Sequence, residues 1–347
     1  MKALVKSHPV PEEVEWTDWP EPVCGDNDIL IKVEAAGICG TDMSVFDWAE
    51  RTVQEHNVRL PIVMGHEFSG LVTQVGKNVK KDINVGDLVT ANIILYCGIC
   101  RFCREGQTNV CDNRPTLGIQ VPGVFAEMVA VRAENVYKVE NGVPPSVAAL
   151  SEPLCVAIHA TERVMPKPGD VVAVVGSGSI GLLMVLVLKE MGVETIFLTG
   201  IAGDENRLAL GRELGAVTIN VSEQEPLEMI LASTGGHGCD IAFETAGHPK
   251  AVLQALSLVR KQGKVGLIGM PHDLTSISTT ALCIRENEMI GIRAYTPATW
   301  QKCVKLLPKL EKQLSRLITH SLPMSEAKQG FALMKKREAI KVILVPK

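Results

Sequence analysis

The chain of 347 residues has no apolar run long enough to cross a membrane. Its longest run, residues 180–188, is short and directly follows a glycine-rich loop, so we expect a buried helix there. The N-terminal residues 1–6 carry no signal-peptide pattern. Acidic and basic residues are interleaved and the net charge is -4, so no basic stripe is available for nucleic acid or a membrane surface. These absences predict a cytoplasmic protein whose partners include neither nucleic acid nor a membrane.

Internal repeats and low-complexity linkers are also missing, and the length is sufficient for two domains. Residues 1 to about 150 contain short runs of branched residues punctuated by glycine and asparagine, which is typical of a small barrel. From about residue 151, apolar strands alternate with helical stretches, which favours a doubly wound parallel sheet. We therefore expect an α/β fold. The expected strands lie at residues 29–35, 70–76, 87–91, 124–131, 171–175, 195–199, 217–220, 240–244, 264–268 and 340–345.

Ten cysteines without a secretory signal argue against a disulfide framework. Four of them form a C-x2-C-x2-C-x7-C array within residues 95–113. Four thiolates from one short loop can surround a tetrahedral zinc ion, and such a closed site is structural because no position stays open for a substrate. An iron–sulfur cluster is the chemical alternative. The four expected ligands are Cys97, Cys100, Cys103 and Cys111.

A G-x-G-x-x-G motif follows the strand expected at 171–175 and opens a helix, which is the context that dinucleotide binding requires. The first glycine makes the turn, the second lets a pyrophosphate approach the backbone, and the third lets helix and strand pack closely. The helix N-terminus then faces the phosphates. The expected cofactor-binding residues of this loop are Gly176, Gly178, Ser179, Ile180 and Gly181.

The end of the next strand informs the choice between NAD and NADP. An acidic residue there would bind the ribose 2′-hydroxyl of NAD, but the chain has Gly200 at this place. The lack of an acid removes repulsion against a 2′-phosphate, and Arg207 could pair with one, so we expect NADP or the use of both cofactors. In the alternative, Asp204 or Glu205 reaches back to the hydroxyl and the cofactor is NAD.

Candidate ligands for a second metal are dispersed along the chain. His66 and Glu67 stand side by side, Cys39 lies in the segment 37–42, and Glu152 lies at the change between the two expected domains. Together they offer zinc sulfur, nitrogen and oxygen. Taken alone, each residue could also have a role without a metal. His66 and Glu67 could be a surface pair, Cys39 a buried structural thiol, and Glu152 a carboxylate at a helix N-terminus.

The segments 37–42, 65–67 and 151–154, with the cysteine array and the glycine loop, resemble the zinc-containing medium-chain alcohol dehydrogenase family over essentially the full length. The resemblance implies a GroES-like β-barrel catalytic domain, residues 1–153 and 291–347, and a Rossmann domain, residues 154–290. It also implies a homodimer or homotetramer, and a role for Thr41 in passing a proton to solvent. The implied residues of a catalytic zinc site are Cys39, His66, Glu67 and Glu152, the last binding the metal or its water.

Within the family the chain is most similar to the polyol and threonine dehydrogenase branch, and segment 198–208 resembles polyol-phosphate dehydrogenases. The expected reaction oxidises a secondary alcohol of a polyol or polyol phosphate, of the sorbitol, iditol or arabitol type, to a ketone. Threonine dehydrogenases carry C-G-T-D-x-H, where this chain has Ser44 in place of the histidine, so an L-threonine 3-dehydrogenase is the alternative. A zinc-free quinone reductase and a non-catalytic dinucleotide-binding regulator are disfavoured by the metal ligands and the glycine loop.

Overall fold

The computed structural model describes residues 1–271 and 273–346. The chain forms two compact units, the first made of Met1–Cys155 with Tyr295–Lys347 and the second of Val156–Ala294. The sequence places the two changes after residues 153 and 290, whereas here the first change falls inside helix α5 (Ser151–Val164) and the return comes at Tyr295. None of the helices in the described residues is long and apolar enough to span a membrane.

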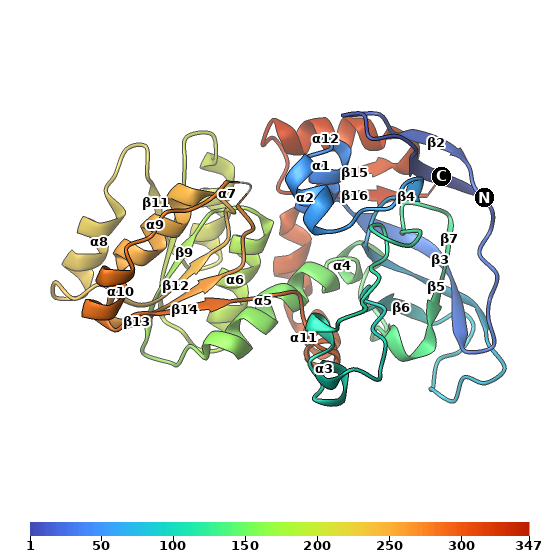
Figure 1. The fold of residues 1–347 in the computed structure, drawn as a ribbon, viewed down its shortest axis with the longest axis horizontal. Coiled ribbons are helices and arrows are strands. Elements are labelled where there is room, and N and C mark those ends of the chain that lie inside the picture. The colour runs from blue at the N-terminus through green and yellow to red at the C-terminus, as the bar shows by residue number, and fades with distance from the viewer. Residues whose placement is uncertain (272, 347) are drawn as a thin grey trace. The chain divides into compact units, whose positions relative to one another are not determined.

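The second unit is built on a six-stranded sheet of order β11-β10-β9-β12-β13-β14, in which every neighbouring pair is parallel (Figure 1). The order reverses between β9 and β12, and ligands of such sheets bind beyond the carboxyl ends of the strands at this switch point. The strands are β9 (Val171–Val175), β10 (Thr195–Gly200), β11 (Val217–Asn220), β12 (Cys239–Glu244), β13 (Val259–Leu267) and β14 (Glu288–Gly291).

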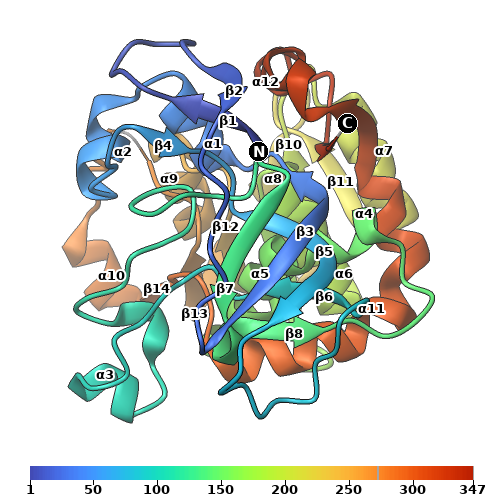
Figure 2. The same ribbon diagram turned by 90° about the vertical axis from the view of Figure 1, so that its right-hand side faces the viewer.

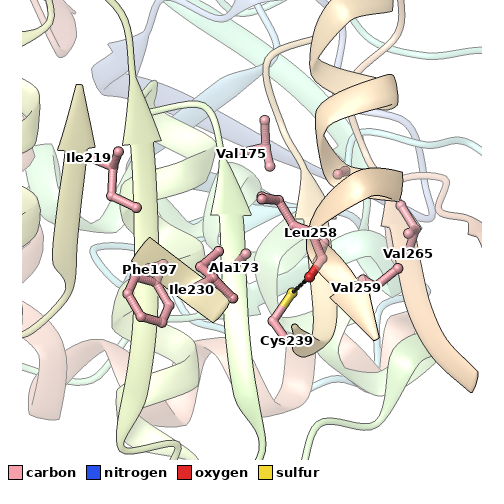
Figure 3. Close-up of a cluster of buried hydrophobic side chains, with 11 residues drawn as sticks. Ala173, Val175, Phe197, Ile219, Ile230, Cys239, Leu258, Val259 and Val265 are labelled. Carbon is pink, nitrogen blue, oxygen red and sulfur yellow. Dashed lines mark hydrogen bonds between the residues drawn. The ribbon is translucent and has the colours of Figure 1, made fainter. Parts of the chain in front are cut away.

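Helices connect these strands and bury them. The connecting helices are α6 (Ser179–Glu190), α7 (Glu205–Glu213), α8 (Pro226–Ser233), α9 (Pro249–Leu258) and α10 (Thr279–Arg285). Figure 3 shows one core cluster, in which Phe197 of the sheet packs with Ile230 of α8 and Leu258 of α9. The Cys239 thiol donates to the Leu258 carbonyl at 3.2 Å, and burial raises its pKa to about 12, so this cysteine is a structural one.

The first unit contains two sheets. A seven-stranded sheet has the order β15-β16-β3-β5-β6-β8, with β7 also paired to β3, and Figure 2 shows the long strand β3 at its centre. A small sheet has the order β2-β1-β4. With the parallel sheet of the second unit, this architecture confirms the expected α/β class. The strands are β1 (Lys2–Lys6), β2 (Glu15–Asp18), β3 (Asp28–Gly37), β4 (Ile62–Val63), β5 (Glu67–Val75), β6 (Leu88–Ala91), β7 (Met128–Arg132), β8 (Val136–Lys138), β15 (Ile318–Pro323) and β16 (Lys341–Val345).

Strand β3 matters most for the site, because β5 and β16 flank its carboxyl end. Gly37, the last residue of β3, pairs with Glu67 of β5 on one side and with Ile343 of β16 on the other. Residues from three distant parts of the chain therefore meet here. The helices of this unit are α1 (Gly40–Phe46), α2 (Glu50–Glu55), α3 (Arg101–Arg104), α4 (Pro145–Ala148), α11 (Pro297–Leu317) and α12 (Ala327–Lys335), with short 3-10 turns at Thr108–Val110, Ala133–Asn135 and Met324–Glu326.

Candidate active site

Cys39 and His66 are held together by one buried carboxylate. Cys39 is the N-cap of α1, and its backbone N–H donates to Oδ2 of Asp42 at 3.0 Å. The other oxygen of Asp42, Oδ1, lies 3.2 Å from Nδ1 of His66. Burial disfavours the imidazolium, but the nearby Asp42 and Cys39 outweigh it and raise the pKa of His66 well above its usual value. The Asp42 carboxylate therefore links the two residues that are expected to bind the catalytic zinc.

The backbone before His66 requires glycine. Gly65 has φ of +89°, and a Cβ there would come within 2.3 Å of the Phe125 ring. The loop that precedes Phe125 packs just as closely, since a Cβ on Gly123 would lie 2.2 Å from the Gly65 carbonyl oxygen. Close packing on both sides fixes the direction in which His66 leaves the backbone.

Glu67 is buried and forms an ion pair with Lys341, the first residue of β16. Lys341 Nζ donates to both carboxylate oxygens, at 2.9 and 2.8 Å, and to the Ile38 carbonyl at 3.0 Å. The pair spans the end of β3 because Gly37 has no side chain: a Cβ there would lie 2.2 Å from Oε2 of Glu67. Burial disfavours the ammonium, but Glu67 outweighs it and raises the pKa of Lys341, so the ammonium keeps its charge in the pair.

Glu152 enters the same region from the first turn of α5. Its Oε1 accepts a hydrogen bond of 2.7 Å from the Tyr295 hydroxyl, and Tyr295 packs edge-on against Trp300. Burial raises the pKa of Glu152 to about 7, with the nearby carboxylate of Glu67 adding to the effect and His66 opposing it. Tyr295 occupies one oxygen of Glu152 and leaves the other available.

These side chains suit a transition metal. A thiol, an imidazole and a carboxylate form a donor set of the kind that catalytic zinc uses, with a fourth position left for a substrate oxygen. Asp42 would orient His66 in the way that outer carboxylates orient metal-bound imidazoles. Glu67 differs from the other candidates, because Lys341 holds both of its oxygens and it could reach a metal only by leaving that pair. Thr41 lies on the first turn of α1, close in sequence to Cys39.

The cysteine array forms a second candidate metal site. Its four ligand atoms lie within 4.8 Å of one another, which is true of no other group of three or more such atoms in residues 1–271 and 273–346. Sγ–Sγ distances of 3.5 Å for Cys97–Cys111, 3.8 Å for Cys100–Cys111 and 3.9 Å for Cys97–Cys103 match the edge of about 3.8 Å that a tetrahedron with Zn–S bonds of about 2.3 Å would have. Backbone N–H groups, that of Asp112 first, lower the pKa of Cys100 to about 6. The geometry fits zinc.

The glycine loop has the geometry that a pyrophosphate needs. Gly176 has φ of +111°, and a Cβ on Gly181 would lie 1.9 Å from the Gly176 carbonyl oxygen, so neither position tolerates a side chain. A Cβ on Gly178, by contrast, would meet nothing within 4 Å. Open space at the second glycine, at the N-terminus of α6, is where a phosphate would approach the backbone. Ser179 and Ile180 begin that helix.

At the end of β10, the acidic and basic side chains are already paired. Asp204 accepts from the Ile201 N–H through Oδ2 at 3.2 Å and from Arg207 through Oδ1 at 3.2 Å. Its carboxylate is 6% exposed. Gly200 is buried, and a Cβ there would lie 2.7 Å from the Ser177 hydroxyl oxygen, which ties this corner to the glycine loop. Asp204 is therefore engaged within the protein, next to the place that the ribose of a dinucleotide would take.

Two residues that contact the expected zinc ligands were not predicted from the sequence. Lys341 stands alone in the apolar run 339–345, and a single charge inside a strand of this kind points to a buried ion pair. Tyr295 is fully buried, and its hydroxyl donates to Glu152. No local pattern marks it, because its partner lies 143 residues away.

Comparisons with known proteins identify the family of both units. A family model of the alcohol dehydrogenase GroES-like domain matches residues 25–141, which confirms the GroES-like character of the first unit, and a model of zinc-binding dehydrogenases matches residues 179–309. The chain is 36% identical to an L-threonine 3-dehydrogenase of Bacillus subtilis, covering 100% of this chain and 99% of that one. It is 34% identical to a D-arabitol-phosphate dehydrogenase of Enterococcus avium, covering 99% and 97%.

Among solved structures, it is similar to a protein of Sinorhizobium meliloti 1021 that is described as a zinc-binding dehydrogenase and was crystallised with NADP. The TM-score is 0.91 at 28% identity, and 99% of each chain is covered. Both units of the fold are thus matched in one protein. Since relatives above 30% identity span the whole chain and both family models match, the expected relationship is confirmed. The chain is a zinc- and NAD(P)-dependent oxidoreductase and belongs to the zinc-containing medium-chain alcohol dehydrogenase family.

Proposed function

We propose that the protein oxidises a secondary alcohol of a polyol or polyol phosphate to the ketone, and catalyses the reverse reaction. The observation that carries the proposal is that Cys39 and Glu152 both lie near enough to His66 in the first unit to interact with it electrostatically. In the described residues, the ligand atoms of these three side chains are not all within 4.8 Å of one another, as those of the four cysteines are, so binding a metal would draw them closer. A second metal at Cys97, Cys100, Cys103 and Cys111 would keep the lobe 95–113 folded, because that lobe has no apolar core of its own.

In this proposal Cys39, His66 and Glu152 would hold the catalytic zinc, which would orient a substrate hydroxyl. Zinc would supply the Lewis acidity that lowers the pKa of an alcohol, and the nicotinamide would accept a hydride. Asp42 fixes the ring of His66, and Tyr295 fixes Glu152. Thr41 passes the released proton towards solvent.

Glu67 could bind the metal only under one condition, namely that it leaves its ion pair with Lys341. Its carboxylate is held in the ion pair with Lys341, and it would become a metal ligand, in exchange for Glu152, by leaving that pair. The buried Lys341 makes that exchange costly, because leaving the pair would strand a buried ammonium. We therefore place Cys39, His66 and Glu152 ahead of Glu67 as ligands.

The substrate class rests on two observations. The relatives include a D-arabitol-phosphate dehydrogenase as well as an L-threonine 3-dehydrogenase. The histidine expected in threonine dehydrogenases is replaced by Ser44, whose hydroxyl donates to the Gly40 carbonyl of its own helix at 3.3 Å. The site therefore lacks the imidazole that threonine dehydrogenases carry at this position, which favours a polyol or its phosphate as the substrate. L-Threonine is the second candidate, because the relatives include an L-threonine 3-dehydrogenase.

A substrate panel tests the proposal. Reduction of cofactor should be followed with sorbitol, arabitol, their phosphates, 2,3-butanediol and L-threonine, each with NAD and with NADP. We expect the largest kcat/KM for a polyol or polyol phosphate. A kcat/KM for L-threonine above that of every polyol would replace the proposal by the threonine alternative.

Cofactor choice gives a separate prediction at Arg207. We propose that its guanidinium, which pairs with Asp204 from the first turn of α7, also binds the 2′-phosphate of NADP beside Gly200. Replacing Arg207 by Ala should then raise KM for NADP about tenfold, the loss expected for one charge-assisted contact of about 1.4 kcal/mol. KM for NAD should change little. Arg212→Ala is the matched control, since Arg212 lies on the same helix and donates to Thr218 instead, at 2.9 Å. Equal effects of Arg207→Ala on both cofactors would contradict the assignment.

A further inference from the structure

Glu244, the last residue of β12, is a fully buried carboxylate that the proposed reaction does not use. Its register places it directly beside Val175 of β9, the residue before the glycine loop, and beside Leu267 of β13. It therefore stands at the switch point of the sheet, at the carboxyl end of one of the two strands between which the order reverses. A buried charge at this place needs specific partners.

The partners of the Glu244 side chain are backbone groups of the turn that follows β12. Oε1 accepts from the N–H of Ala246 at 2.8 Å and from that of Gly247 at 2.7 Å. Oε2 faces the turn after β13, where a Cβ on Gly269 would come within 2.5 Å of it. The main-chain carbonyl of Glu244 accepts from the N–H of Gly269 at 3.1 Å. The Glu244 carboxylate thus fixes the turn after β12, and the main-chain carbonyl of the same residue fixes the turn after β13, against which the buried Oε2 packs without a hydrogen-bond partner in the described residues.

The two turns also pack on each other and on the glycine loop. A Cβ on Gly269 would lie 2.3 Å from the Gly247 nitrogen, so the turns are in close contact. Thr245 Oγ1 lies 3.0 Å from the Gly176 carbonyl oxygen, and a Cβ on Gly176 would lie 2.9 Å from the Ala246 nitrogen. Movement of either turn would therefore shift the wall of the phosphate-binding loop.

The position of β12 in the strand order indicates which half of a bound dinucleotide these two turns would contact. The strand that follows the glycine loop in sequence, β10, ends beside the adenosine ribose in folds of this kind. Strand β12 lies on the opposite side of β9 from β10. The turns after β12 and β13 therefore flank the nicotinamide half.

We infer that Glu244 is a positioning residue for the nicotinamide half of the cofactor, holding the turns at 245–247 and 268–270 against the glycine loop. The inference rests on the dinucleotide site proposed above. It predicts that loss of the carboxylate weakens binding of the whole dinucleotide but spares ligands that contain the adenosine half alone. A residue that merely supported the sheet would affect both.

The test is calorimetric titration of the full-length, zinc-loaded protein with NADPH or NADH and with 5′-AMP or adenosine 2′,5′-bisphosphate. Glu244→Ala should raise Kd for the dinucleotide about tenfold, since two hydrogen bonds to a charged group are lost, and leave Kd for the fragments within about twofold. Glu244→Gln keeps one acceptor oxygen for Ala246 and Gly247, so it should recover most of the affinity.

Asp240→Asn is the matched control at the other end of β12. Asp240 also accepts from a backbone N–H, that of Val171 at 2.7 Å, and from Arg260 at 2.7 Å, but it lies far along the strand from the turns. We expect unchanged affinity for both ligands in this variant. An equal loss for dinucleotide and fragment in Glu244→Ala, or no loss for either, would overturn the inference. If the unaltered protein bound neither ligand, the dinucleotide site itself would be wrong.

Discussion

Replacing Cys39 by Ala should reduce kcat/KM by roughly 10³-fold or more, because the catalytic metal contributes several kcal/mol and each 1.4 kcal/mol is about a factor of ten in rate. The zinc content should fall from two ions per chain to one, since the lobe of four cysteines is separate in sequence and retains its own ion. Initial rates and atomic absorption of the same sample measure both effects.

The matched control for Cys39→Ala is Cys24→Ala. Cys24 is another half-buried thiol of the same unit, but its Sγ donates to the Asp28 carbonyl at 3.5 Å and has no part in the proposed site. This variant should keep two zinc ions and full activity. A Cys39→Ala protein that retains near-normal activity would remove Cys39 from the mechanism, and with it the proposed donor set.

Removing the partner of Glu67 has the largest expected effect on stability. Lys341→Met should lower the free energy of unfolding of the first unit by about 3–5 kcal/mol, because breaking a buried ion pair leaves an uncompensated buried charge. Both side chains are almost completely inaccessible, at 2% and 0% exposure, so solvent screening does not reduce the effect. Four tryptophans, all in the first unit, report its unfolding in urea by fluorescence: Trp16, Trp19, Trp48 and Trp300.

The double variant Glu67→Gln, Lys341→Met distinguishes the ion pair from simple packing. With both charges removed, no buried charge is left alone, and the double variant should be more stable than Lys341→Met. The single variant Glu67→Gln completes the comparison. If the free energy that the double variant loses equals the sum of the losses in Glu67→Gln and Lys341→Met, the two side chains do not interact as the structure shows. Lys335→Met is the matched control. Lys335 pairs with Glu12 and Asp47 at the surface, where solvent screens the charges, so this variant should be far less destabilised than Lys341→Met.

The sequence predicts well the features that depend on neighbouring residues. The apolar run at 171–175 forms β9, and the glycines that follow have the steric roles expected of them. The cysteine array comes together because its ligands lie on one short loop. These patterns are local, so chemistry and spacing suffice to read them.

Other parts depend on contacts between distant residues. The strand expected at 124–131 begins only at Met128. Val124 and Phe125 donate to the Gly65 and Met64 carbonyls in the loop before His66, and the Phe125 carbonyl accepts from Leu4 of the small sheet. The small sheet β2-β1-β4 has no counterpart among the expected strands. The pairing of Glu67 with Lys341 joins residues 274 positions apart, and nothing near either residue indicates it. The expected zinc ligation by Glu67 was inferred without that lysine.

The most direct test of the metal site is a crystal structure of the purified protein with anomalous data collected on both sides of the zinc absorption edge. The account predicts two zinc peaks per chain, one among the four cysteines and one within bonding distance of Cys39 Sγ, the His66 imidazole and a Glu152 oxygen. Glu67 should remain paired with Lys341. A chain with no peak between Cys39 and His66 would contradict the central claim. Glu67 bound to zinc, with Lys341 unpaired, would overturn the proposed order of ligands.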